Sequence, residues 1–183
     1  MKKLLFLVVF LPFIGIKAQE KISRELSGGV VFQKTQNLYI ENGVGLDYTC
    51  NRLLKKKIHI KATYLSSRLG SAIGSNALKQ DNFILGADYR FFSDKQLQLI
   101  AGLNTGLFTV DYENNVFNDL PSSSLLLAIE TGLNYKFKQL PLSASLSVGY
   151  NLRNGNGVDI PGSLFPVFYK LGFMYRIDNL FNK

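Results

Sequence analysis

Residues 142–153, LSASLSVGYNLR, alternate strictly between two chemical classes. One set is apolar (Leu142, Ala144, Leu146, Val148, Tyr150 and Leu152), and the other is small, polar or charged (Ser143, Ser145, Ser147, Gly149, Asn151 and Arg153). Successive side chains of a strand point to opposite faces, so this segment is predicted to be a strand between an apolar and a polar environment. The polar set is predicted to face a lumen and the apolar set to face lipid.

The same alternation recurs along the chain and predicts eight strands. They are expected near 25–34, 37–50, 57–66, 82–92, 96–110, 124–138, 141–153 and 164–177. No position on the predicted lipid face is charged, although 19% of the chain is Asp, Glu, Lys or Arg. A Lys or Arg at the bilayer midplane costs ~2–4 kcal/mol, which accounts for this exclusion. The predicted fold class is all-β, an eight-stranded antiparallel up-and-down transmembrane β-barrel.

Charged residues gather on the opposite, inward face. They are Glu41, Asp47, Lys61, Asp88, Arg90, Glu130, Lys136, Lys170 and Arg176. The interior of an eight-stranded barrel is just wide enough for side chains to fill it. Because an unpaired buried charge is costly, these residues are predicted to form a salt-bridge and hydrogen-bond network that closes the lumen. A narrow pore lined by the same residues is the alternative.

Three tight hairpins allow a prediction of strand register. Directly opposed residues of an antiparallel hairpin must lie on one face, so each turn restricts the pairing. The pairs that preserve the assigned faces are Asp47 with Lys61 and Tyr48 with Ile60, Arg90 with Gln98 and Tyr89 with Leu99, and Lys136 with Ser143 and Tyr135 with Ala144.

The connections alternate between short and long. The links 51–56, 93–95 and 139–140 are short, and the links 67–81, 111–123 and 154–163 are long. Outer-membrane barrels have short periplasmic turns and long outer loops, so both termini are predicted to be periplasmic. Two aromatic girdles are expected, Tyr48, Tyr89, Phe91, Tyr135, Phe137 and Tyr175 at the periplasmic interface and Phe32, Tyr64, Phe108, Tyr112 and Tyr150 at the outer one.

The N-terminus has the pattern of an export signal. A basic start, Met1-Lys2-Lys3, precedes an apolar run over 4–16 that is too short to span a membrane as a helix. Cleavage after Ala18 would remove three lysines and no acid, so the formal net charge of +8 falls to +5. The predicted domains are a signal peptide, 1–18, and one barrel domain, 19–183.

The sequence offers no catalytic or metal-binding constellation. Its single histidine, His59, has no serine two residues away, because Lys61 stands there. A serine hydrolase needs a serine beside a histidine and an orienting acid, and one histidine with the lone Cys50 cannot build a multi-histidine or cysteine metal centre. We therefore predict no enzymatic activity, no cofactor and no metal. Nucleic acid is not expected as a partner of an exported barrel.

The C-terminal strand carries a further motif, formed by Lys170, Gly172, Tyr175 and Ile177. This spacing resembles the signal that outer-membrane barrels present to their assembly machinery. The whole chain from residue 19 resembles the small outer-membrane β-barrel family, of the OmpA/OmpX-type size, and the leader ending at 17–19 resembles those of Bacteroidetes outer-membrane proteins. The resemblance implies a Gram-negative outer membrane, its lipid and the barrel-assembly machinery as partners, and a monomer.

For function, we predict a non-enzymatic outer-membrane protein with a structural and surface-interaction role. Its long loops would meet an extracellular partner that the sequence does not identify, because loops on rigid scaffolds commonly carry recognition. The alternatives are a narrow, porin-like small-solute channel, an accessory subunit of a secretion or uptake machine, and a soluble lipocalin-like carrier.

Overall fold

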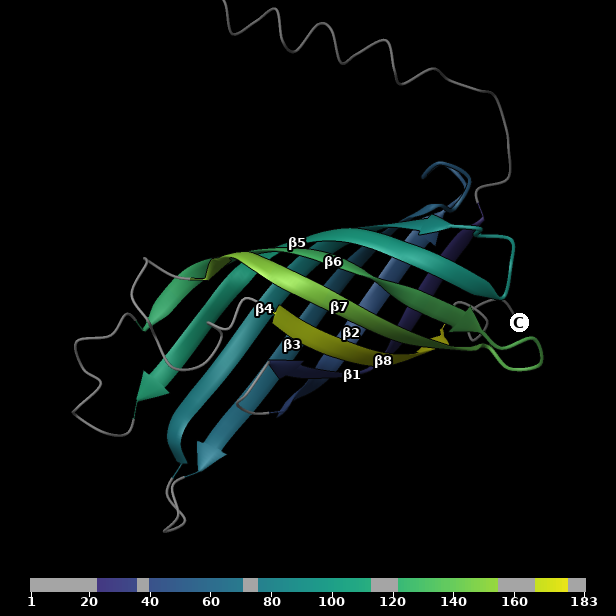
Figure 1. Cartoon of the computed structure of the whole chain (residues 1–183). Helices are drawn as coiled ribbons and strands as arrows, with labels where there is room; N and C mark the ends of the chain where they lie inside the picture. Colours follow the sequence, from purple (N-terminus) through teal and green to yellow (C-terminus); the bar gives the residue numbers. More distant parts are fainter. Residues whose placement is uncertain (1–22, 36–39, 71–75, 113–121, 155–166, 178–183) are drawn as a thin grey trace, which may run out of the picture.

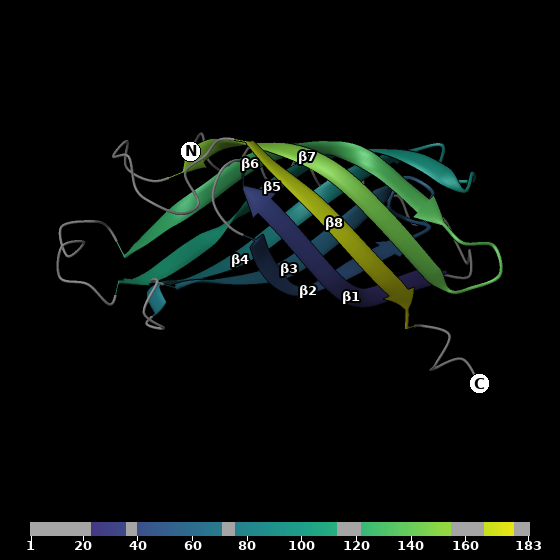
Figure 2. The ribbon, with the colours of Figure 1, turned by 60° about the horizontal axis from the view of Figure 1, so that its bottom comes forward.

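Eight antiparallel strands close into a barrel in which each strand pairs with its sequence neighbours and β1 pairs with β8 (Figures 1 and 2). The computed structural model describes residues 23–35, 40–70, 76–112, 122–154 and 167–177. The strands are β1 (Arg24–Thr35), β2 (Ile40–Cys50), β3 (Ile58–Gly70), β4 (Asn76–Phe91), β5 (Leu97–Tyr112), β6 (Ser123–Lys136), β7 (Leu142–Asn154) and β8 (Val167–Arg176). The predicted fold class is confirmed. The expected signal peptide, 1–18, lies outside the described residues.

The two faces of each strand differ as the sequence predicts. In β6, Leu125 and Leu127 point outward and are 51% and 42% exposed, whereas Leu126 and Glu130 point inward and are 7% and 5% exposed. Large apolar side chains therefore cover the outside of the barrel, and the buried set is rich in polar groups. A barrel in a bilayer needs this arrangement, with apolar side chains outside and polar side chains inside, which is the reverse of a soluble protein. Among the described residues, no helix is long and apolar enough to cross a membrane.

Aromatic side chains gather where strands meet the turns. At the end of the barrel that carries the short turns 51–57, 92–96 and 137–141, called here the short-turn end, Tyr89 packs on Phe91 at 4.7 Å and Tyr135 on Phe137 at 5.1 Å between ring centroids. At the opposite, long-loop end, the prediction for Phe108 is wrong. Phe108 stands at an even-numbered position of β5, and these positions face the lumen. Its side chain is fully buried in an apolar cluster.

The register confirms two of the three predicted hairpins. Asp47 lies opposite Lys61 and Lys136 opposite Ser143, but Arg90 lies opposite Ile100 rather than Gln98. The β4–β5 pairing is thus shifted by two residues, which leaves the faces unchanged. The shift arises because Phe91 pairs with Leu99, so residues 92–98 lie outside the β4–β5 ladder, and Leu97 and Gln98 pair only with β6. This connection begins at Phe92, which has a left-handed φ of 56°, and the Lys95 N–H donates to the Phe92 carbonyl at 2.8 Å.

The first predicted outer loop, 67–81, is mostly strand. β3 continues to Gly70 and β4 begins at Asn76, so only 71–75 separates them. The prediction relied on the alternation of apolar and polar residues, which ends near Phe83. The backbone hydrogen bonds between β3 and β4 continue beyond that point through polar residues. The Tyr64 hydroxyl donates to Asp81 Oδ1 at 2.8 Å at this boundary. β3, β4 and β5 therefore continue past the last outward apolar side chains, and Figure 1 shows these strands running on to the long-loop end. The centres of the other two predicted loops lie outside the described residues.

Candidate functional site: the charged lumen

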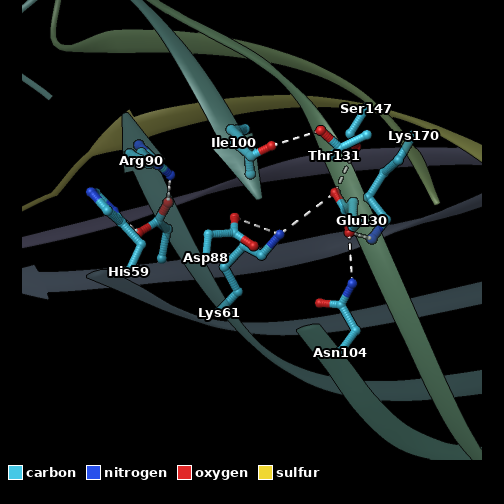
Figure 3. A network of polar contacts seen from close by, with 11 residues as sticks. His59, Lys61, Asp88, Arg90, Ile100, Asn104, Glu130, Thr131, Ser147 and Lys170 are labelled. Carbon is cyan, nitrogen blue, oxygen red and sulfur yellow. Dashed lines mark hydrogen bonds and ion pairs between the residues drawn. The ribbon is translucent and has the colours of Figure 1, made fainter. Parts of the chain in front are cut away.

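Glu130 on β6 is the centre of a polar cluster in the lumen (Figure 3). Its carboxylate accepts hydrogen bonds from Asn104 Nδ2 at 2.7 Å, Ser147 Oγ at 2.6 Å and Lys170 Nζ at 2.7 Å. Lys61 Nζ lies 3.6 Å away. These partners come from β5, β7, β8 and β3, so one side chain links β6 to four other strands. Because each partner is a hydrogen-bond donor, the site satisfies a carboxylate that is 5% exposed.

Lys61 joins Glu130 to a second carboxylate, Asp88 on β4. The Lys61 ammonium lies 2.8 Å from Asp88 Oδ2. Lys61 stands opposite Asp47 in the strand register, as predicted, but its ammonium turns across the lumen to Asp88 and Glu130 instead. Two lysines, Lys61 and Lys170, thus balance two buried acids. We call Lys61, Asp88, Glu130 and Lys170 the central cluster.

A separate cluster lies nearer the short-turn end and consists of Asp47, His59 and Arg90. Asp47 accepts from His59 Nδ1 at 2.7 Å and forms a close ion pair with the Arg90 guanidinium. A carboxylate can only accept, so Nδ1 is the protonated nitrogen of the ring. The other ring nitrogen, Nε2, is buried and has no hydrogen-bonding partner among the described residues. The Arg90 charge compensates Asp47, and His59 holds the carboxylate from the second side.

Glu41 is held differently from the other acids. Gln33 Nε2 at 2.5 Å, Asn82 Nδ2 at 2.7 Å and Gln80 Nε2 at 3.4 Å all donate to its carboxylate, which is 1% exposed. No ion pair to Glu41 is found within the described part of the chain. Amides from β1 and β4 therefore replace the cation that the sequence led us to expect.

Apolar side chains fill the lumen at the long-loop side. Phe108, Val110 and Leu126 form a buried cluster, against which Ile84 packs. Spaces of about 20 Å³ and 30 Å³ remain between the side chains, the smaller beside Phe168 and Asn104 and the larger beside the central cluster. A space needs about 10–15 Å³ on this measure to hold one water molecule. Each space is thus the size of a water or two, and the lumen between them is packed.

Two predicted members of the network lie apart from it. Lys136 lines the mouth at the short-turn end and makes no ion pair within the described residues, whereas Arg176 lies there 3.7 Å from Glu25. The nine inward charges therefore do not form one network, because the barrel holds them at different heights. The assembly motif lies on and just after β8, where Lys170 and Gly172 are buried and Tyr175 is 44% exposed.

Sequence reasoning placed His59, Asn104 and Ser147 on the inward face but assigned no polar partner to any acid. The partners are Gln33, His59, Gln80, Asn82, Asn104 and Ser147. Their inward parity was readable from the alternation, but their assignment to particular acids was not. Asn104 and Ser147 reach Glu130 diagonally, since the residues directly opposite Glu130 are Gly102 and Gly149. Diagonal contacts depend on side-chain rotamers and on the tilt of the strands.

Ion pairs and hydrogen bonds are the polar contacts that the described lumen residues make. No group of three or more His, Cys, Asp or Glu residues within the described ranges has the geometry to hold a metal ion. His59, the single histidine, contacts an acid and sits beside an arginine, with no serine among the contacts found for it. The arrangement can hold strands together, and it can admit a solute only if the side chains move.

Comparison with solved structures identifies the fold. The N-terminal β-barrel domain of Pseudomonas aeruginosa OprF aligns with a TM-score of 0.59 and 14% identity, over 83% of this chain and 96% of that one. The chain has the fold of the small eight-stranded outer-membrane β-barrels. P. aeruginosa OprH gives 0.54 and 16% over 83% and 99%, and Yersinia pestis Ail, in a nanodisc, gives 0.51 and 15% over 84% and 99%. No family model matches the sequence, and no curated protein matches it.

Proposed function

We propose that the protein is a non-enzymatic outer-membrane barrel with a closed lumen, whose long-loop end is a surface for interaction. The observation that carries this proposal is the packed interior. Charged, amide and apolar side chains fill the lumen from the central cluster to Phe108, leaving spaces of about 30 Å³ and 20 Å³. A barrel that fills its own interior offers its chemistry to partners at its ends.

The proposed location follows from the outward face. Its exposed apolar side chains match a bilayer, and the aromatic pairs at the short-turn end match a membrane interface. In the proposed orientation the short turns face the periplasm and the long connections face outward. The chain would reach this membrane through a signal peptide, 1–18, and be inserted by the barrel-assembly machinery, with the motif on β8 as its signal.

The long-loop end offers a rigid platform. β4 and β5 each contain 16 residues, whereas a tilted strand needs about 9–11 to cross the hydrocarbon core. The outward side chains of the extra residues are polar, among them Lys79, Asp81, Thr109 and Asp111. Lys79 and Asp111 approach within 4.0 Å on this exposed surface. An ordered polar sheet that projects past the membrane suits recognition of an extracellular partner.

A narrow channel is the second candidate, and a specific observation favours it. A space of about 480 Å³ opens at the short-turn end and ends near Asp47 and Arg90, and the water-sized space beside the central cluster lies beyond it. Rearrangement of Lys61 and Lys170 around Glu130 would join these spaces. The two candidate functions therefore differ in whether Lys61 and Lys170 leave Glu130 when the barrel is in the membrane. If they do, the lumen can open, and if they do not, it stays closed.

Conductance in a planar bilayer separates the two. The mature chain, residues 19–183, is refolded, and its folding is checked by the mobility of unboiled and boiled samples on a gel. A silent barrel supports the proposal. Discrete steps that change in Lys170→Gln, but not in the exposed control Lys79→Gln, would establish the channel instead. If the barrel is silent, replacing 71–75, 113–121 and 155–166 together should abolish binding to cell surfaces or matrix while folding persists, and retained binding would refute the surface role.

A further inference from the structure

Two turns at the short-turn end hold large apolar side chains on a disfavoured backbone. Leu54 has a φ of 46° and Phe92 has a φ of 56°. This left-handed region favours glycine, and a bulky residue there is a genuine outlier. The two side chains are 58% and 53% exposed, so burial within the described barrel does not offset the strain. Residues under such strain cluster at functional sites, which marks these two turns as a candidate surface.

The two turns lie next to each other on the rim of the barrel. The turn 51–57 joins β2 to β3, and the turn 92–96 joins β4 to β5. The Arg90 N–H donates to the Lys57 carbonyl at 2.7 Å, so β3 and β4 run side by side up to these turns. Phe91, the last residue of β4, is 44% exposed on the apolar outward face. The second turn therefore starts at the edge of the face that we assign to the bilayer.

Cations lie beside the two apolar side chains. Lys95 Nζ is 5.2 Å from the centroid of the Phe92 ring, and Lys55 and Lys57 are exposed in the neighbouring turn. No ion pair to these three lysines is found within the described residues. The turn 51–57 contains four Lys or Arg residues and the turn 92–96 contains one, against a single acid, Asp94. The surface thus combines exposed apolar groups with an excess of positive charge.

We propose that these two turns bind anionic phospholipid of the bilayer around the barrel. The apolar side chains enter the boundary between headgroups and acyl chains, and the lysines lie at the level of the lipid phosphates. Amphipathic and polybasic segments bind membrane surfaces through the same two terms. An acidic protein would match the charge, but Phe91 at the same edge faces hydrocarbon, which makes lipid the adjoining partner. This inference rests on the proposed membrane location and is independent of the surface role of the long-loop end.

The chain contains no tryptophan, so one introduced tryptophan reports a single position. The Phe92→Trp variant is refolded into phosphatidylcholine vesicles that contain a small, equal fraction of either brominated phosphatidylglycerol or brominated phosphatidylcholine, with bromine near the headgroup. Bromine quenches the fluorescence of a neighbouring tryptophan. We expect quenching by both lipids, stronger quenching by phosphatidylglycerol, and loss of this difference at high salt. Leu54→Trp is a second reporter, which should behave alike, and gel mobility shows that each variant folds.

Matched variants complete the test. Phe83→Trp, at the other end of β4 and 55% exposed, should be quenched equally by both lipids, which checks the membrane location by itself. In the Phe92→Trp background, Lys95→Gln should lower the preference for phosphatidylglycerol, by about fivefold at most. Lys79→Gln, at the long-loop end, should leave it unchanged. The proposal is overturned if both turn reporters escape quenching while Phe83→Trp is quenched, if the two lipids quench the turn reporters equally, or if Lys79→Gln acts as strongly as Lys95→Gln. An unquenched Phe83→Trp would instead refute the membrane location, and the proposal with it.

Discussion

Substitution of Glu130 by Gln tests how the lumen is held together. The change keeps the size of the side chain and two of its hydrogen bonds, because the amide oxygen can accept from Asn104 and the amide NH2 can donate to the Ser147 hydroxyl, which lie 2.7 Å and 2.6 Å from the two carboxylate oxygens. It removes the negative charge. Lys61 retains Asp88 at 2.8 Å, but Lys170 is left as a buried cation with no remaining ion pair among the described residues.

The expected magnitude follows from this asymmetry. Breaking a buried ion pair from one side costs about 3–5 kcal/mol, most of it the cost of the charge left behind. Because the Gln amide keeps two hydrogen bonds, Glu130→Gln should lower the free energy of unfolding by about 3 kcal/mol, at the low end of that range. Lys170→Met alone leaves Glu130 with Lys61 and should cost less. The double variant removes both members of the pair and should recover much of the loss.

The assay is reversible urea unfolding in lipid vesicles, followed by circular dichroism and by gel mobility. The exposed pair of Lys79 and Asp111, 4.0 Å apart, is the control, and Lys79→Gln should cost less than about 1 kcal/mol. A cost for Glu130→Gln no greater than that of the control would refute the reasoning. So would a double variant whose loss equals the sum of the two single losses, since the ion pair would then contribute no coupling.

Three further changes test other parts of the barrel. Leu103→Arg, on the outward face of β5, should lower the free energy of unfolding in vesicles by about 2–4 kcal/mol, whereas Thr109→Arg beyond the apolar band should have little effect; equal losses would contradict the membrane assignment. Gly43→Ala should destabilise the barrel by about 1–3 kcal/mol in urea unfolding, because the added methyl would collide with the Tyr64 carbonyl oxygen. Gly172→Ala is the control and should cost less, because its methyl would meet only the Ser145 hydroxyl, at 2.7 Å. Tyr175→Ser should reduce assembly in cells, measured as the heat-modifiable band in outer-membrane fractions, while refolding in vitro stays near wild type; normal assembly would show that the motif on β8 is not the signal.

The sequence predicts which residues face the lumen better than which of them touch. Parity alone assigns Glu130, Asp88 and Lys61 to the inside, because a two-residue period needs no knowledge of neighbouring strands. Contacts depend on register, and register depends on the conformation of turns. The turn that begins at the left-handed Phe92 is asymmetric, because Phe91 pairs with Leu99 rather than with Leu97, and Arg90 therefore lies opposite Ile100 and not opposite Gln98. The extension of β3 and β4 was missed for a related reason, since a strand that leaves the membrane loses its apolar face but keeps its hydrogen bonds.

One signal in the sequence favours the observed β4–β5 register, and it is the placement of glycine. In the observed pairing Gly86 lies opposite Asn104 and Gly102 opposite Asp88. A methyl at either glycine would collide with the carbonyl or carboxylate oxygen of the residue that it faces.

Glycines also lie opposite larger side chains on other strands, where Gly132 faces Ser147 and Gly149 faces the ring of Phe168. The predicted pairing, two residues away, would instead set Gly86 opposite Gly102 and Asp88 opposite Ile100. It would leave an empty space at one height of the barrel and overfill the next. Between β4 and β5 the small residues therefore oppose larger ones, and this steric fit favours the observed register over the one that hydrophobic alternation also allows.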